Sequence, residues 1–185
     1  MKPNKNLIIL IIAIVLFIIS LFFDSQIFIF IQSMRCPVTD TFFSWLLVIE
    51  KDIIFYPLVI FATLIILSIK NKKNILPYVI GLVAAGVLTL VLKVIFARPR
   101  PNGLDELSFP SGHATLLMAS IPFLNNKIIK IVWIILSCVF LLARLWLGLH
   151  YLSDIIAGAI VGYFIPLIIY RLIKIKAKRR GRKRK

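Results

Sequence analysis

Both histidines of the chain, His113 and His150, lie in short polar clusters that interrupt long hydrophobic segments. The clusters occupy residues 93–101, 110–113 and 144–154. Cations, imidazoles and a carboxylate are costly to keep at membrane depth, so such residues mark a functional site by default. The types and spacing of these side chains therefore indicate chemistry.

His150 and Asp154 are four residues apart, which places them one turn apart on the same face of a helix. The Asp154 carboxylate can accept a hydrogen bond from one ring nitrogen of His150 and so fix its tautomer. The other ring nitrogen is then free to act as a nucleophile. This pair is the candidate centre of a covalent mechanism.

His113 follows Pro110-Ser111-Gly112, where a loop is expected to turn into a helix. The N–H groups and the positive dipole end of a helix N-terminus suit an anion. Gly112 allows the backbone to approach a ligand closely, and the Ser111 hydroxyl can donate a hydrogen bond to it. This segment is a candidate anion-binding turn.

Lys93, Arg100 and Arg144 add three cations, and arginine is suited to bidentate contact with phosphate. Together with two histidines and one carboxylate they compose a phosphoryl-transfer site. One histidine would attack phosphorus and the other would protonate the leaving oxygen. No second carboxylate accompanies Asp154, so neither a metal ion nor another cofactor is expected.

The composition predicts an all-α membrane protein. Hydrophobic residues make up 61% of the 185-residue chain, and the mean hydropathy is +0.99. Soluble domains are roughly 45–50% apolar. Several runs approach the ~20 apolar residues that a membrane helix requires. We expect one membrane-embedded domain over residues 1–185. The two cysteines, Cys36 and Cys138, are not spaced from a histidine as metal ligands would be.

Six apolar segments are expected to form a bundle of transmembrane helices. They are residues 7–23, 53–69, 75–97, 113–124, 128–147 and 150–170. Residues 24–52 are mixed in character, and an interfacial helix is expected there from their Trp and Phe content. The segment 113–124 would be about 18 Å long, shorter than a hydrocarbon core of about 30 Å. His113 is therefore expected near headgroup depth.

The distribution of charge predicts how the helices are oriented. With the N-terminus inside, 17 of the 23 basic residues fall on the inner side, and all seven acidic residues fall on the outer side. Basic residues beside membrane helices favour the cytoplasm. We expect a multi-pass protein of the cell membrane with both termini cytoplasmic and all three clusters on the outer face.

The three clusters together resemble the signature of the type 2 phosphatidic acid phosphatase superfamily. That signature reads Lys-x6-Arg-Pro, then Pro-Ser-Gly-His, then Ser-Arg-x5-His-x3-Asp. The corresponding residues here are Lys93 with Arg100-Pro101, Pro110-Ser111-Gly112-His113, and Ala143-Arg144 with His150 and Asp154. Ala143 stands where serine is usual, which removes a potential hydroxyl contact.

The resemblance implies a role for each motif residue. His150 would form a phosphohistidine, Asp154 would orient it, and His113 would be the general acid. The phosphate would be held by Lys93, Arg100, Ser111, Gly112 and Arg144. Arg98 lies outside the signature, and its alternatives stay open: a loop cation, or a contact to the substrate.

The resemblance also implies a membrane lipid phosphatase. Polyprenyl diphosphates such as undecaprenyl diphosphate are slightly favoured as substrates, with phosphatidic acid and phosphatidylglycerol phosphate as alternatives. A non-catalytic carrier of phosphate or lipid phosphate is the main rival, and a membrane anchor for a nucleic-acid-binding tail is a weaker one. The basic tail, residues 171–185, is expected to be cytoplasmic and to bind anionic lipid rather than nucleic acid. The oligomeric state is left open.

Overall fold

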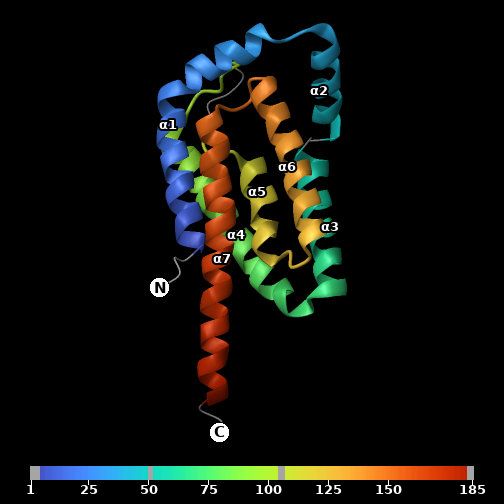
Figure 1. Ribbon diagram of the computed structural model, residues 1–185, viewed down its shortest axis with the longest axis vertical. Helices are drawn as coiled ribbons and strands as arrows, with labels where there is room; N and C mark the ends of the chain where they lie inside the picture. Colours follow the sequence, from blue (N-terminus) through green and yellow to red (C-terminus); the bar gives the residue numbers. More distant parts are fainter. Residues whose placement is uncertain (1–4, 50–51, 104–106, 183–185) are drawn as a thin grey trace.

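The computed structural model describes residues 5–49, 52–103 and 107–182, and this part of the chain is a bundle of helices (Figure 1). Two short 3-10 turns, η1 (Lys72–Asn74) and η2 (Ile121–Phe123), precede α4 and follow α5. The helices are α1 (Lys5–Ser33), α2 (Pro37–Ile49), α3 (Asp52–Lys70), α4 (Ile75–Phe96), α5 (Gly112–Ser120), α6 (Lys127–Trp146) and α7 (Leu152–Arg182). The all-α membrane fold predicted from the sequence is confirmed.

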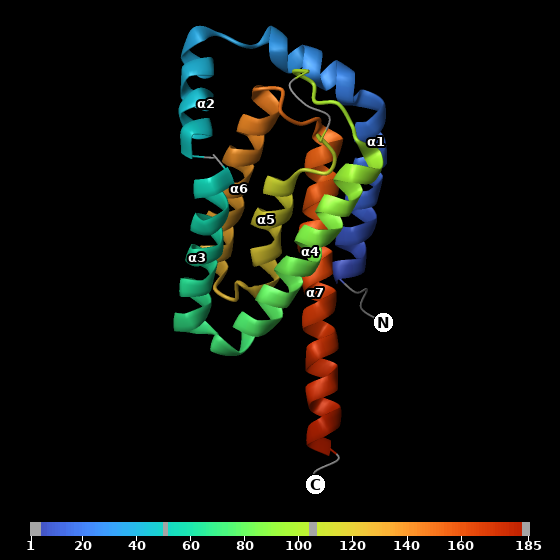
Figure 2. The same ribbon diagram turned by 180° about the vertical axis from the view of Figure 1, so that it is seen from behind.

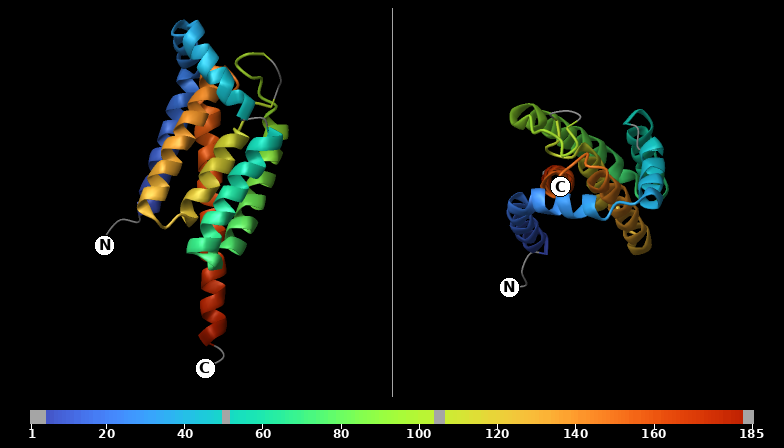
Figure 3. Two further views of the ribbon diagram at one scale, coloured as in Figure 1. Left: turned by 90° about the vertical axis from the view of Figure 1, so that its right-hand side faces the viewer. Right: turned by 90° about the horizontal axis from the view of Figure 1, so that it is seen from above.

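The helix α7 occupies the middle of the bundle when it is seen from above (Figure 3), and it packs against α1, α4 and α5. Two glycines one turn apart, Gly158 and Gly162, allow this packing. A Cβ atom at Gly158 would collide with the Ser111 carbonyl oxygen, and one at Gly162 would collide with the Thr115 carbonyl oxygen. Small residues at such spacing let membrane helices approach backbone to backbone. This pair was not among the residues identified from the sequence.

The helix α1 extends beyond the boundary expected from the sequence. It was expected to end at residue 23, but it continues through Asp24 to Ser33. At 29 residues it is about 43 Å long, and its second half runs across one end of the bundle (Figure 3). Asp24 is therefore a buried helical residue, with 4% of its surface exposed, and not part of a connecting segment.

The helix α2 lies within the region for which an interfacial helix was expected. It packs on the end of α6 through Phe43 and Trp146, whose ring centroids are 5.0 Å apart. The Trp146 indole also donates a hydrogen bond to Asp40 over 3.0 Å. Trp45 and Val38 on its other side are exposed. An exposed apolar side beside a packed side fits a helix at the membrane boundary.

The expected count of six membrane spans is not confirmed. Among the described residues, five helices are long and apolar enough to cross a membrane: α1, α3, α4, α6 and α7. The segment expected at 113–124 is the nine-residue α5 followed by η2. Most residues of α5 are buried, so it is an inner helix enclosed by its neighbours. Its two ends are set by Ser111, whose hydroxyl caps the first turn, and by the 3-10 turn at Pro122.

The polar clusters and the terminal helix ends lie at opposite ends of the bundle. The α4–α5 connection and the α6–α7 turn lie at one end, while the start of α1 and the end of α7 point toward the other (Figures 1 and 2). The three polar clusters are therefore at the end opposite the termini. The basic tail is a helical continuation of α7 as far as Arg182, and residues 183–185 lie outside the described part of the chain.

Candidate active site

His150 lies in the turn before α7 and not in a helix with Asp154 as the sequence predicted, whereas Asp154 lies in the first turn of α7. Both residues are almost completely buried, with 3% and 0% of their surface exposed. The Nδ1 atom of His150 faces Asp154 Oδ2 at 3.7 Å, too far for a hydrogen bond. This nitrogen has no hydrogen-bond partner among the described residues. Catalytic hydrogen bonds are often long before a substrate binds, so the predicted orienting contact is approached but not made.

A tight turn between α6 and α7 fixes the backbone of His150. Gly148 adopts a φ of +67°, the left-handed conformation that commonly ends a helix. The carbonyl oxygen of Arg144 then accepts the N–H groups of Leu149 at 2.9 Å and His150 at 3.3 Å. His150 is therefore tied directly to the backbone of another candidate residue.

His113 lies in the first turn of α5 with 4% of its surface exposed. Its Nε2 atom is 2.5 Å from Nη2 of Arg144, which is itself buried. The ring stacks on Phe55 at a centroid distance of 5.0 Å and meets the edge of Tyr56 at 5.1 Å. Two aromatic residues of α3 thus hold the imidazole in place, a support that the sequence analysis missed.

The predicted cations Lys93 and Arg100 reach the same end of the bundle. Lys93 lies in the last turn of α4 and its ammonium group donates to the Leu107 carbonyl oxygen. Arg100 donates to the Leu149 carbonyl oxygen over 2.9 Å, next to His150. The positive charges of Arg100 and Lys93 oppose protonation of His150, although burial is the main reason that its pKa is lowered.

Ser111 and Gly112 form the junction between the loop and α5. The Ser111 hydroxyl accepts from the Ala114 N–H at 3.4 Å, and its backbone N–H donates to the Asp154 carbonyl oxygen at 3.0 Å. A Cβ at Gly112 would lie 2.5 Å from the hydroxyl oxygen of Tyr56. The eight predicted residues therefore lie at the same end of the bundle, and contacts or backbone hydrogen bonds join His113 to Arg144, Arg144 to His150, and Ser111 to Asp154.

A set of polar contacts around Asp154 was not predicted from the sequence. Arg98 donates to Asp154 Oδ1 and to Asp24 Oδ2, each over 2.8 Å. Ser108 donates to Asp154 Oδ2, and Ser153 donates to Asp24. Arg98 thus contacts two carboxylates of the protein, a role that was not among the alternatives expected from the sequence. A carboxylate inside an apolar run, as at Asp24, was the available signal.

Among the described residues, the side chains that could ligate a metal ion are not gathered at this site. Within the part of the chain that the structure describes, no three His, Cys, Asp or Glu side chains are grouped so that they could hold a metal ion. The candidate phosphate ligands are instead cationic or neutral groups.

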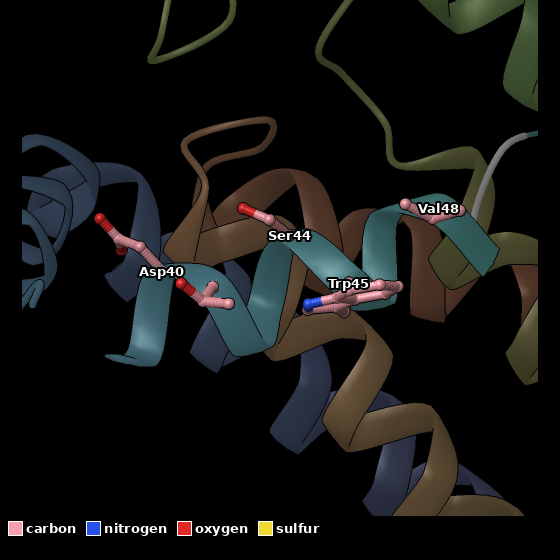
Figure 4. Close-up of a pocket in the computed structure, with 5 residues that line it drawn as sticks. Asp40, Ser44, Trp45 and Val48 are labelled. Atoms are coloured by element: carbon pink, nitrogen blue, oxygen red, sulfur yellow. The ribbon is translucent and has the colours of Figure 1, made fainter. Parts of the chain in front are cut away.

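Two hollows differ in their relation to these residues. One of about 380 Å³ runs along α2 and is lined by Asp40, Thr41, Ser44, Trp45 and Val48, none of them a candidate site residue (Figure 4). The other, of about 230 Å³, lies between α3, α4 and α5. Its walls are mainly apolar, including Ile60, Leu82 and Leu90, while Lys93 and Gly112 contribute to the same cavity. Only the second hollow touches the candidate site.

Two relatives are similar in sequence. The chain is 31% identical over 115 residues to the bacitracin transport permease protein BcrC of Bacillus licheniformis, covering 55% of this chain and 56% of that protein. It is 27% identical over 136 residues to the undecaprenyl-diphosphatase BcrC of Bacillus subtilis (strain 168), covering 66% and 69%. The chain thus matches little more than half the length of the first relative.

Two solved structures have a similar fold. The crystal structure of Aquifex aeolicus LpxE has a TM-score of 0.65 and 25% identity, covering 80% of this chain and 94% of that one. A transmembrane PAP2 type phosphatidylglycerolphosphate phosphatase from Bacillus subtilis has a TM-score of 0.69 and 18% identity, covering 89% and 96%. The second likeness concerns the fold alone.

The sequence match to a family covers the candidate site completely. Residues 74–178, more than half of the chain, match the PAP2 superfamily. That segment contains Lys93, Arg100, Pro110–His113, Arg144, His150 and Asp154. The protein is therefore a multi-pass membrane member of the PAP2 superfamily.

Proposed function

We propose that this protein is a lipid phosphatase that hydrolyses a phosphate monoester or diphosphate of a membrane lipid. The observation that carries the proposal is the placement of His150 beside Asp154, joined through Arg144 to His113. A buried nucleophile, a carboxylate to balance its charge and a second imidazole are the groups that phosphoryl transfer through histidine requires. Binding alone would need only the cations.

The reaction would proceed in two displacements. Because Nδ1 of His150 faces Asp154, Nε2 is the nitrogen that attacks phosphorus. The phosphorus–oxygen bond to the lipid breaks, and His113 gives the departing oxygen a proton. In the second step His113 takes a proton from water, the water oxygen bonds to phosphorus, and the phosphorus–nitrogen bond breaks to release inorganic phosphate. Arg144, Lys93 and Arg100 would neutralise the phosphoryl oxygens in both steps.

The cavity between α3, α4 and α5 supports a lipid as the substrate. Its mainly apolar walls suit a hydrocarbon chain, while Lys93 and Gly112 belong both to it and to the phosphate-binding set. A polyprenyl diphosphate such as undecaprenyl diphosphate is the favoured substrate, since the Bacillus subtilis relative is an undecaprenyl-diphosphatase. The leaving group would then be the lipid monophosphate.

Phosphate release by the purified protein tests this function. The panel comprises undecaprenyl diphosphate, phosphatidic acid and phosphatidylglycerol phosphate in detergent, each with and without a metal chelator. We expect release that the chelator leaves unchanged and that His150→Ala abolishes. A wild-type protein that binds the lipid phosphates but liberates no inorganic phosphate from them would instead be a carrier. Loss of activity on chelation would contradict metal-free chemistry.

We also infer that the basic end of α7 binds anionic lipid headgroups. Arg171, Lys174 and Lys176 are exposed on the helix that projects beyond the bundle (Figure 1). Basic residues near an anionic surface contribute about 1 kcal/mol each. Replacing these three residues by glutamine should reduce the phosphatidylglycerol that co-purifies with the protein in nanodiscs of mixed lipid. An unchanged lipid ratio would contradict the inference.

A further inference from the structure

We propose that Asp24 and Arg98 are positioning residues for the His150–Asp154 pair, which makes α1 a functional part of the active site. The inference rests on the proposed function, because it assigns His150 as the nucleophile. Neither residue is one of the signature residues, although Arg98 lies within the first polar cluster, residues 93–101. Asp24 also lies outside residues 74–178, the segment that matches the PAP2 superfamily.

Asp24 anchors the arrangement from α1. Its Oδ1 atom accepts a hydrogen bond from the backbone N–H of Ser153 at 3.0 Å. Its Oδ2 atom accepts hydrogen bonds from the Ser153 hydroxyl and from Nη2 of Arg98. Ser153 is the residue immediately before Asp154. Asp24 therefore holds both the first turn of α7 and the guanidinium group that reaches Asp154.

Arg98 carries the connection to the catalytic carboxylate. Its Nη1 atom donates to Asp154 Oδ1 at 2.8 Å and to the Ser153 hydroxyl at 2.7 Å. Its guanidinium carbon lies 4.1 Å above the centre of the Tyr151 ring, which restricts the side chain further. Two carboxylates from separate helices thus share one guanidinium group.

This arrangement divides the two oxygens of Asp154 between different tasks. Arg98 occupies Oδ1, while Oδ2 accepts the Ser108 hydroxyl and the Tyr151 N–H at 2.8 Å and faces His150 Nδ1 at 3.7 Å. A rotation of the carboxylate would break the contacts on both oxygens. Oδ2 is therefore kept directed toward the imidazole that must be oriented.

The network also sets the charge beside His150. Attack on phosphorus makes the imidazole cationic, so the local negative charge favours the transition state. Within this group the two carboxylates outweigh Arg98 by one unit of negative charge, which offsets part of the positive charge that Arg100 and Lys93 place near His150. Removing Asp24 would leave Arg98 opposing the cationic ring, and removing Arg98 would expose the ring to both carboxylates. The two losses should therefore act on His150 with opposite sign.

The test uses full-length protein with a tag that contains no histidine. The variants are Asp24→Asn, Arg98→Gln and Arg98→Lys. The control is Arg35→Gln, which breaks an exposed arginine–aspartate pair with Asp40, an ion pair separate from the Asp24–Arg98–Asp154 contacts. One readout is kcat and KM separately, and the other is 15N NMR of the histidine rings. The chain has only two histidines, so a His113→Gln background assigns the His150 signals.

Asp24→Asn and Arg98→Gln should each lower kcat by about tenfold or more, since hydrogen bonds to charged groups are of that strength. KM should stay within about twofold, because neither side chain holds the phosphate. The pKa of His150 should fall in Asp24→Asn and rise in Arg98→Gln. The other charged groups that act on the ring, Asp154, Lys93 and Arg100, are the same in both variants. Arg98→Lys should recover much of kcat, and Arg35→Gln should match the wild type.

Several outcomes overturn the positioning role. A kcat of Asp24→Asn or Arg98→Gln equal to that of Arg35→Gln would do so. Shifts of the His150 pKa in the same direction in both variants would also do so, because they indicate general loosening of the structure. Asp24→Asn is isosteric, so its kcat and its effect on the His150 pKa decide the question if Arg98→Gln does not fold. A wild-type protein that releases no phosphate refutes the proposed function, whereas the NMR shifts still decide the role of Asp24 and Arg98.

Discussion

Arg144 Nη2 lies 2.5 Å from His113 Nε2, so the cation assigned to phosphate binding is hydrogen-bonded to the proposed proton donor. Arginine has only donors, and the imidazole nitrogen must therefore be the acceptor. In this state His113 holds no proton on Nε2. An incoming phosphate would attract the donors of Arg144 and leave Nε2 available for a proton. In the mechanism that we propose, phosphate binding by Arg144 and the acid role of His113 are thus coupled by one contact.

The acid role of His113 predicts a dependence on the leaving group. His113→Ala should lower kcat about 10²- to 10⁴-fold for a lipid monophosphate, the usual contribution of a general acid. The loss should be much smaller for p-nitrophenyl phosphate, because its leaving phenolate needs no proton. Steady-state rates with both substrates check this. Equal losses with both would show that His113 acts in binding and not in proton transfer.

Burial of His150 predicts the effect of pH. Burial lowers the pKa of this imidazole below its ordinary value of 6.5, against the opposing attraction of Asp154. The unfolded chain binds a proton near pH 6.5 while the folded protein does not, so folding stability should decline as pH falls below that value. The nucleophile should remain neutral to lower pH. Thermal unfolding and kcat followed from pH 8 to pH 5 test this, and a loss of activity beginning above pH 6.5 would contradict it.

Much of the site was predictable because the signature residues carry their own chemistry. The charged clusters, their common end of the bundle and a helix that begins within one residue of His113 all follow from the sequence. The contacts of Arg98 with Asp24 and Asp154 do not, since they join residues 74 and 56 positions apart. Pairing over such distances depends on how α1 packs against α7, which no local pattern specifies.

The fold was predictable to a similar extent. Long apolar runs predict membrane helices, but the carboxylate of Asp24 led us to predict that the first helix ends at residue 23, whereas α1 continues to Ser33. Asp24 is tolerated within the helix because Arg98 and Ser153 satisfy its oxygens. The short α5 was also counted as a span. Its length was visible in the sequence, but its enclosure by other helices depends on tertiary packing.

The close contact between Gly112 and Tyr56 predicts a coupled pair of substitutions. A methyl group at Gly112 would lie 2.5 Å from the Tyr56 hydroxyl, so Gly112→Ala must displace that side chain. Since the Tyr56 ring packs against His113, the displacement should reach the imidazole and lower kcat by about tenfold, near 1.4 kcal/mol. Adding Tyr56→Phe should recover part of the loss. A double variant no better than Gly112→Ala would place the defect in the phosphate contact itself.

The packing of α7 on α5 predicts a difference between two glycines. Gly162→Ala should destabilise the protein by about 1–3 kcal/mol, typical of overpacking, because its methyl group would meet the Thr115 backbone. Gly86 also lies within a helix but has nothing within 4 Å of a Cβ, so Gly86→Ala should be neutral or stabilising. Thermal unfolding in one detergent compares them. Similar melting temperatures for the two variants would contradict the close approach of α5 and α7.

The two cysteines provide a test of the orientation that we propose from the charge distribution. Cys36 lies in the turn between α1 and α2, at the end of the bundle that holds the candidate site, and Cys138 is exposed on the side of α6. Hydrogen bonds from Thr39 lower the pKa of the Cys36 thiol, which favours the reactive thiolate. A membrane-impermeant maleimide should therefore label Cys36 in intact cells, and Cys36→Ser should abolish that labelling. Labelling only after the cells are opened would place this end of the bundle, with His113 and His150, on the cytoplasmic side.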